Sequence, residues 1–410
     1  MIQVFSFLFR QRGGAAGRKG ALQAANFLRA MSLLLAFGIA FGGVQAALVQ
    51  TALAQTAPDA LDTSTPVYFN PDGGSYFHAD PQCSTVNKKY RPLATISLAD
   101  IFTPTYASLD PCKRCAASFA GVLEAMEKQS LMTPVTLSIP REGAQPADAP
   151  PLSAECAVLY DLTNSRILYE KNAAQRCEPA SLTKLLTVLT AYANDGSAIE
   201  YTVGDEIEMI GSNSSVAYLR KKNVLSFQSL VDAVMLASGN DAAYTLAVNL
   251  AREEAGNKRM ENEEALTAFA DLMNDTAKTL GCTDSHFVSV DGYPSPEHYT
   301  TAYDMLRIAI TAANTPLTAK SAARTRAYHV FISGREAIWE TTNLLLKSNS
   351  EYYYPYATGL KTGSTGEGFS LAASAEKDGT RLIAIIINAR GEAERFQEAA
   401  ALFEYGFQGR

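Results

Sequence analysis

The chain has 410 residues, of which 47% are hydrophobic and 19% charged, and its formal net charge is −7 at pH 7. This length has room for more than one domain, and both fractions are ordinary for globular protein. The negative charge argues against a general nucleic-acid-binding protein, so we expect no nucleic-acid partner.

Residues 1–54 have the pattern of a secretory signal. An uncharged run from Ala30 to Pro58 follows a positive lead, and Ala52-Leu53-Ala54 supplies a small-residue cleavage site. The run is also long enough to span a bilayer if it is retained. We therefore expect an exported protein, in the cell wall or periplasm. The segment is either removed after Ala54 or kept as an N-terminal membrane anchor. The positive lead consists of Arg10, Arg12, Arg18, Lys19 and Arg29.

Residues 67–120 predict a small compact unit. Val67-Tyr68-Phe69 and Ser75-Tyr76-Phe77-His78 are expected to be strands, because the turn-forming run Asn70-Pro71-Asp72-Gly73-Gly74 separates them. A helical stretch is expected near Ser97–Ile101.

His78, Cys83, Cys112 and Cys115 have the ligand types and the C-x-x-C spacing of a four-coordinate zinc site. The pattern resembles small modules of exported bacterial proteins and the metal-binding module of a DNA-alkylation repair protein. The alternative is a disulfide with a spare thiol, which an oxidising compartment favours. In both cases we expect attachment or recognition, and no catalytic role.

Residues 133–152 are rich in Pro and Ala without apolar periodicity, which predicts an extended linker. From residue 153 to 410 the composition is that of a folded enzyme. Residues 156–161 and 166–170 predict a hairpin. Cys156 and Cys177 bracket this hairpin closely enough for a disulfide, and Cys282 is expected to be a buried thiol.

Pro179-Ala180-Ser181-Leu182-Thr183-Lys184 precedes an apolar helical run. Residues three apart share a helix face, so the Ser181 hydroxyl and the Lys184 amine are expected to meet at the first turn. Pro179 suits a helix start, and the free N–H groups there favour an alkoxide and a neutral amine. This chemistry is that of a serine activated by a lysine base. Ser-x-x-Lys alone also describes an ordinary surface helix start.

Ser238-Gly239-Asn240 lies between two apolar helical stretches, the first of them at 227–236. A polar loop there can face a cleft, or its Ser and Asn can simply cap helices. Further along, Thr300 or Thr301 is the expected N-cap of another helix.

Lys361-Thr362-Gly363 precedes two apolar runs that flank Asp378-Gly379, a strong hairpin signal. The Lys361 segment is expected to be the adjacent strand, with Gly363 leaving room for a ligand backbone. A strand end followed by a turn is the structural alternative.

Ser-x-x-Lys, Ser-x-Asn and Lys-Thr-Gly in this order are the motifs of penicillin-recognising serine enzymes. Residues 153–410 resemble the serine-type D-alanyl-D-alanine carboxypeptidases, the low-molecular-weight penicillin-binding proteins. The terminal Tyr405-Gly406-Phe407 adds to this resemblance. It implies an α+β fold of the β-lactamase/transpeptidase type, with a five-stranded antiparallel sheet flanked by helices and an all-helical subdomain. The small cysteine-containing module precedes this domain.

The resemblance also implies roles. Ser181 is the nucleophile that forms an acyl-enzyme, Lys184 takes its proton, and Ser238 relays a proton to the leaving amine. The base must be partly neutral, and we expect burial near a second cation, Lys361, to lower its pKa. The expected partners are peptidoglycan stem peptides, with β-lactam antibiotics as inhibitors, and catalysis needs no cofactor.

Further residues are implied to bind the substrate. Asn240 holds the substrate amide and Thr362 binds the terminal carboxylate. Arg395, placed like an arginine of the family, is implied to help neutralise this carboxylate, and the alternative is that it is only a surface helix charge. The backbone N–H groups of Ser181 and Ser364 are expected to form the oxyanion hole.

Larger members of the family carry a β-rich domain and a membrane-lying helix after Tyr-Gly-Phe, and we expect neither here because the sequence stops at Arg410. Any attachment is then expected from the N-terminal segment or the cysteine module. Three alternative functions remain. They are an endopeptidase acting on cross-links, a serine β-lactamase, and a non-catalytic sensor of peptidoglycan or penicillin. A β-lactamase typically needs a Glu-x-x-x-Asn element, and the acidic run Glu261-Asn262-Glu263-Glu264 does not have that form.

Overall fold

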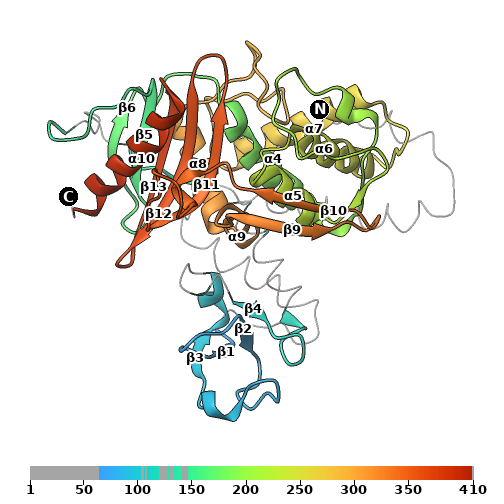
Figure 1. The fold of residues 1–410 in the computed structure, drawn as a ribbon, viewed down its shortest axis with the longest axis vertical. Coiled ribbons are helices and arrows are strands. Elements are labelled where there is room, and N and C mark those ends of the chain that lie inside the picture. The colour runs from blue at the N-terminus through green and yellow to red at the C-terminus, as the bar shows by residue number, and fades with distance from the viewer. Residues whose placement is uncertain are drawn as a thin grey trace, which may run out of the picture. The chain divides into compact units, whose positions relative to one another are not determined.

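A computed structural model describes residues 64–102, 106, 109–119, 128, 131, 133–139 and 146–408 (Figure 1). The predicted signal or anchor over residues 1–54 lies outside these ranges. Within them, no helix combines the length and the apolar character needed to cross a membrane.

The N-terminal module contains a four-stranded sheet of order β3-β1-β2-β4. As predicted, the run from Asn70 to Gly74 turns the chain between the first two strands, and Gly73 N–H donates to Asn70 O at 3.3 Å. The stretch expected to be helical is a 3-10 helix at Leu98–Phe102, directly after β3. The strands are β1 (Pro66–Phe69), β2 (Tyr76–His78), β3 (Ala94–Ser97) and β4 (Asp110–Pro111), with a 3-10 turn at Lys88–Tyr90.

The C-terminal domain is built on a five-stranded sheet of order β11-β12-β13-β5-β6, in which every neighbouring pair is antiparallel. This sheet confirms the predicted α+β fold and both predicted hairpins. Strand β11, which carries the Lys-Thr-Gly motif, is an edge strand. The strands are β5 (Cys156–Asp161), β6 (Arg166–Lys171), β11 (Ala357–Ser364), β12 (Phe369–Lys377) and β13 (Thr380–Ala389).

Both faces of the sheet are covered by helices, because alternate residues of a strand point to opposite faces. On β13, Ile383 and Ile385 join the core shared with α8 (Ala302–Asn314). Leu382 and Ile386 join the second core, under α10 (Glu392–Phe407). This double coverage explains why β13 is a continuous apolar run.

The helical part of the domain surrounds α4 (Thr183–Ala193), in which every residue except Ala193 is buried. Figure 1 shows α4, α5, α6 and α7 grouped at one side of the sheet. The predicted cap at Thr301 is present, where Thr301 accepts from Asp304 N–H. Ser226 caps α5 in the same way by accepting from Ser229 N–H. The remaining elements are α5 (Phe227–Met235), α6 (Asn240–Glu254), α7 (Asn262–Thr279), α9 (Pro316–Ala322), the hairpin β9 (Arg326–Val330) and β10 (Glu336–Glu340), and the pair β7 (Tyr201–Thr202) and β8 (Val224–Leu225).

The predicted linker contacts the domain at Val135, whose N–H donates to Leu280 O at 3.0 Å. One sequence expectation needs correction here. Cys156 and Cys177 are buried and hydrogen-bonded to each other, but they are free thiols and not a disulfide. Cys282 is a buried thiol, as expected.

Candidate active site

Ser181 lies in a short 3-10 turn, Ala180–Leu182, directly before α4 begins at Thr183. The predicted helix start is therefore correct to within two residues, with Pro179 as the cap residue of the turn. Ala180 has a φ of 51°, in the left-handed region that non-glycine residues rarely adopt. The turn places Ser181 at the positive end of the helix dipole.

The Ser181 hydroxyl and the Lys184 amine meet as the spacing predicted, with 2.8 Å between Oγ and Nζ. Lys184 is fully buried, and its Nζ also donates to Asp291 O at 2.8 Å. Burial lowers the pKa of Lys184 to about 8, although the Asp291 and Asp241 carboxylates oppose this shift. A substantial neutral fraction near pH 8 suits the amine to act as a base.

Lys361 approaches the pair from β11, and its Nζ donates to Ser238 Oγ at 2.8 Å and to Thr362 O at 2.9 Å. The expected lowering of the Lys184 pKa is present, and its cause is burial. The pKa of Lys361 is lowered by its own burial, by Lys184 and by Arg395. Two buried amines in one site resist carrying two charges.

The rate of acylation is expected to rise with pH through about 8, because Lys184 accepts a proton only in its neutral form and that form dominates above its pKa. The measurement is the second-order rate constant for β-lactam acylation across roughly pH 6 to 10. A rate constant that stays flat or falls through pH 8 contradicts the assignment of Lys184 as the base.

The Ser238–Asn240 loop joins α5 to α6 and faces the same cleft. Ser238 has a φ of 55° and is buried beside Lys361, and Asn240 is the first residue of α6. The Asn240 Oδ1 atom is buried and has no hydrogen-bond partner among the described residues. An unpartnered buried acceptor at a cleft is available to a ligand N–H.

Asp241 fixes this loop, a function that the sequence did not indicate. Its carboxylate accepts from the N–H groups of Ala217 and Leu219 at 2.7 and 2.8 Å. Asn240 N–H donates to Ser215 O at 2.8 Å. These bonds hold a serine-rich segment, residues 212–215, against the cleft.

Gly363 lies against the turn that carries Ser181. A Cβ at this position would lie 3.0 Å from Ala180 Cβ and 3.1 Å from Ser181 N. The absence of a side chain therefore lets β11 approach the Ser181 turn closely. Thr362, one residue earlier, shares a 2.6 Å hydrogen bond with Thr342 through their hydroxyls.

Arg395 is 4% exposed, which excludes the alternative of a surface helix charge. It lies in the first turn of α10, where Nη1 donates to Gly363 O at 3.0 Å and Nη2 donates to Glu392 at 2.7 Å. Its guanidinium therefore reaches the end of β11, and its Nε is buried without a partner among the described residues.

These side chains surround a polar cleft of about 550 Å³. Of the predicted residues, Ser181, Ser238, Asn240, Thr362, Gly363, Ser364 and Arg395 line it, and Lys184 and Lys361 lie buried behind it. Sequence reasoning missed the turn Asp291-Gly292-Tyr293 and the segment 212–215, which also line it. A Gly inside a polar turn and a serine-rich run were the available signals, and both are common in ordinary loops.

None of the four histidines lines this cleft, and all four lie in the described ranges. His298 is buried, and burial lowers its pKa to about 4. Its Nδ1 accepts from Val288 N–H at 3.1 Å, and its Nε2 is 2.9 Å from Thr183 Oγ1. A neutral His298 therefore ties the segment at Val288 and Ser289 to the start of α4.

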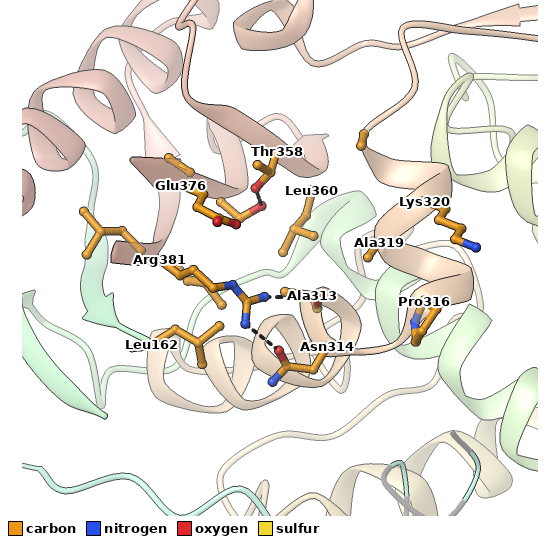
Figure 2. Close-up of a pocket in the computed structure, with 15 residues that line it drawn as sticks. Leu162, Ala313, Asn314, Pro316, Ala319, Lys320, Thr358, Leu360, Glu376 and Arg381 are labelled. Atoms are coloured by element: carbon orange, nitrogen blue, oxygen red, sulfur yellow. Dashed lines mark hydrogen bonds between the residues drawn. The ribbon is translucent and has the colours of Figure 1, made fainter. Parts of the chain in front are cut away.

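A second hollow, of about 190 Å³, lies elsewhere on β11 (Figure 2). It contacts this strand at Thr358 and Leu360, whereas the cleft contacts it from Thr362 onward. Figure 2 shows Arg381 crossing it to reach Asn314 at 3.0 Å. The hollow contains none of the predicted site residues and is separate from the candidate active site.

The sheet, the helical subdomain and the solved structures that they match place the domain in the class of penicillin-binding DD-peptidases with the transpeptidase fold. The chain belongs to the D-alanyl-D-alanine carboxypeptidase family, whose model matches residues 143–391, more than half of the chain. This is a family of cofactor-independent serine peptidases.

The chain is similar to D-alanyl-D-alanine carboxypeptidase DacC of Escherichia coli, with 31% identity over 64% of this chain and 64% of that protein. It is 29% identical to DacF of Bacillus subtilis over 62% of each. The chain thus spans less than two thirds of the length of these relatives.

For two solved structures, the match covers a larger share of the solved chain. The Streptomyces K15 DD-transpeptidase matches with a TM-score of 0.58 and 25% identity, over 64% of this chain and 100% of that one. Penicillin binding protein 6B from Escherichia coli matches with a TM-score of 0.54 and 29% identity, over 67% and 82%.

Proposed function

We propose that this chain is a serine D-Ala-D-Ala carboxypeptidase that removes the terminal D-alanine from peptidoglycan stem pentapeptides. The observation that carries the proposal is the 2.8 Å contact between Ser181 Oγ and the buried, partly neutral amine of Lys184. Family membership and the names of the relatives support the substrate class.

In the proposed first step, Ser181 Oγ attacks the carbonyl carbon of the D-Ala-D-Ala bond as Lys184 Nζ takes its proton. The backbone N–H groups of Ser181 and Ser364 stabilise the oxyanion. The C–N bond then breaks as Lys184 returns that proton through the Ser238 hydroxyl to the leaving amine, so that free D-alanine departs and Lys184 is neutral again. Lys361, 2.8 Å from Ser238 Oγ, orients this hydroxyl.

In the second step, water attacks the acyl-enzyme ester and gives its proton to Lys184, which returns a proton to Ser181 as the shortened stem leaves. The same serine is acylated by β-lactam antibiotics, whose amide occupies the place of the D-Ala-D-Ala bond. These drugs are therefore the proposed inhibitors.

The proposed substrate contacts use polar groups that the cleft leaves available. Asn240 Oδ1 accepts from the substrate amide, and Thr362 donates to the terminal carboxylate. Arg395 and Lys361 supply positive charge for this carboxylate. Its negative charge in turn favours the protonated form of Lys361.

We also propose export, on the strength of the basic lead and apolar run in residues 1–54. A mature protein beginning at Gln55 supports cleavage, whereas an intact chain in the membrane fraction supports an anchor.

The function is tested with a muramyl pentapeptide and a cross-linked peptide dimer as parallel substrates. We expect free D-alanine from the pentapeptide and little cleavage of the dimer. Faster dimer cleavage makes the protein an endopeptidase, and rapid turnover of a chromogenic cephalosporin makes it a β-lactamase. Penicillin binding without turnover of either peptide overturns the proposal in favour of a sensor.

A further inference from the structure

Four side chains of the N-terminal module, His78, Cys83, Cys112 and Cys115, converge on one point. Their candidate ligand atoms all lie within 4.8 Å of one another. The first three side chains are buried, and Cys115 is half-buried. Cys83 Sγ is 4.0 Å from Cys112 Sγ, and Cys115 Sγ is 3.5 Å from His78 Nδ1.

The separations of 4.0 and 3.5 Å are close to those between ligands of a tetrahedral zinc ion. With Zn–S of about 2.3 Å and Zn–N of about 2.0–2.1 Å, tetrahedral angles put two sulfurs about 3.8 Å apart and a sulfur and a nitrogen about 3.6 Å apart. Both measured distances are within about 0.2 Å of these values. One His and three Cys form a ligand set that zinc prefers.

The competing arrangement, a disulfide with a spare thiol, fits less well. A disulfide needs sulfurs at about 2.05 Å, and the 4.0 Å between Cys83 and Cys112 leaves them unbonded. A disulfide would involve only two of the four converging side chains. It would not explain why His78 Nδ1 faces the Cys115 sulfur. A shared metal ion accounts for all four.

The backbone is arranged to hold the sulfurs. His78 ends β2 and Cys112 follows β4, and these two strands pair in parallel. The N–H groups of Arg114 and Cys115 donate to the Cys112 sulfur, and the Thr85 hydroxyl lies 3.1 Å from Cys83 Sγ. Hydrogen bonds of this kind orient thiolate ligands from the second layer of a metal site.

The described part of the module has only short strands and a small hydrophobic core. Its strands have two to four residues, and its core is a small group that includes Val67, Phe77, Leu98 and Phe119. Domains below roughly 70 residues commonly need a disulfide or a metal ion to remain folded. The described cysteines of the module form no disulfide.

We propose that His78, Cys83, Cys112 and Cys115 bind one Zn²⁺ ion as a structural centre of this module. The three thiols release their protons to solvent as they coordinate the ion as thiolates. Four protein ligands complete the tetrahedron, so no position is left for a substrate or a reactive water. The site goes beyond the peptidase reaction and does not depend on it.

The test is the metal content of the full exported chain, purified without chelator, measured by inductively coupled plasma mass spectrometry. We expect one zinc ion per chain. Exchange of the metal for Co²⁺ is expected to give the strong visible bands of a tetrahedral, thiolate-ligated ion. Cys112→Ser and Cys115→Ser are each expected to lose the bound metal.

Cys282→Ala is the matched control, because Cys282 is a buried thiol outside the cluster, and it is expected to keep the metal. Labelling by fluorescent penicillin in all variants reports whether the peptidase domain is folded and reactive. Metal content reports on the zinc site, so failure of the zinc proposal and failure of the proposed function are distinguished. The proposal is overturned if the wild-type chain holds no metal both as purified and after reconstitution. A Cys83–Cys112 disulfide in the exported protein also overturns it.

Discussion

Replacing Lys184 by arginine is expected to lower the rate constant for acylation of Ser181 by about 100- to 10,000-fold, the usual contribution of a general base. Arginine keeps its proton at any working pH, so it cannot accept the proton of the serine hydroxyl. The buried amine of Lys184, with a pKa of about 8, can accept this proton. The measurement is the rate of labelling by a fluorescent penicillin, together with the melting temperature as a check on folding.

Lys278→Arg is the matched control, because this lysine is an exposed side chain on α7. Its ion-pair partner, Asp275, lies on the same helix and not in the cleft. It is expected to label at the wild-type rate. Unchanged labelling of a folded Lys184→Arg protein would show that another group takes the proton. Only a slow rate in a folded variant supports the proposed role.

Replacing Gly292 by alanine is expected to lower acylation by at least about 100-fold, the cost of misplacing a reacting group by about 1 Å. Gly292 has a φ of 86°, and an added Cβ would lie 1.8 Å from Ala180 O and 3.0 Å from Ser181 N. The obstacle is backbone, so the turn that carries the nucleophile has to move. The measurement is again penicillin labelling, with the free energy of unfolding determined in parallel.

Gly256→Ala is the control that separates two effects of Gly292→Ala. These are the steric clash of the added Cβ with Ala180 and the free-energy cost of a non-glycine residue in the left-handed backbone region. Gly256 has a φ of 61°, but an added Cβ there meets no atom within 4 Å. This control is expected to lose only about 1–2 kcal/mol of unfolding free energy and to acylate normally. If Gly292→Ala also acylates at the wild-type rate, then the Asp291 turn does not position Ser181.

The parts of the fold that sequence predicted are those with strong local patterns. The hairpin of β12 and β13 follows from two apolar runs around Asp378-Gly379, and both residues adopt the positive φ that this turn requires. The contact between Ser181 and Lys184 follows from the three-residue spacing at a helix start. Each of these signals lies within one element or between neighbours in the chain.

The parts that sequence missed depend on contacts between distant residues. The second partner of Lys184 is a backbone oxygen of Asp291, 107 residues away, and Arg395 bonds Gly363 O across 32 residues. Every residue has a backbone carbonyl, so the residue type does not indicate that this oxygen is used. The β9–β10 hairpin was also missed, because its strands expose apolar residues such as Tyr328 and Ile338 and do not alternate clearly.

The pKa shifts of the two lysines show the same limit. The motifs indicate that Lys184 and Lys361 share a site, but the depth of burial and the surrounding charges set the pKa of each amine. Asp291 and Asp241 support the charge on Lys184, whereas Arg395 opposes the charge on Lys361. Asp241 and Asp291 are brought near Lys184 by the fold, and their positions in the sequence do not indicate this.

The central claim is that Ser181 is the nucleophile of an acyl-enzyme, and mass spectrometry of the protein after reaction with benzylpenicillin tests it most directly. We expect the wild-type chain to gain the mass of one penicilloyl group, on the peptide that contains Ser181, and a folded Ser181→Ala protein to gain none. An adduct of equal yield in Ser181→Ala, or one mapped to another residue in the wild type, would contradict the mechanism.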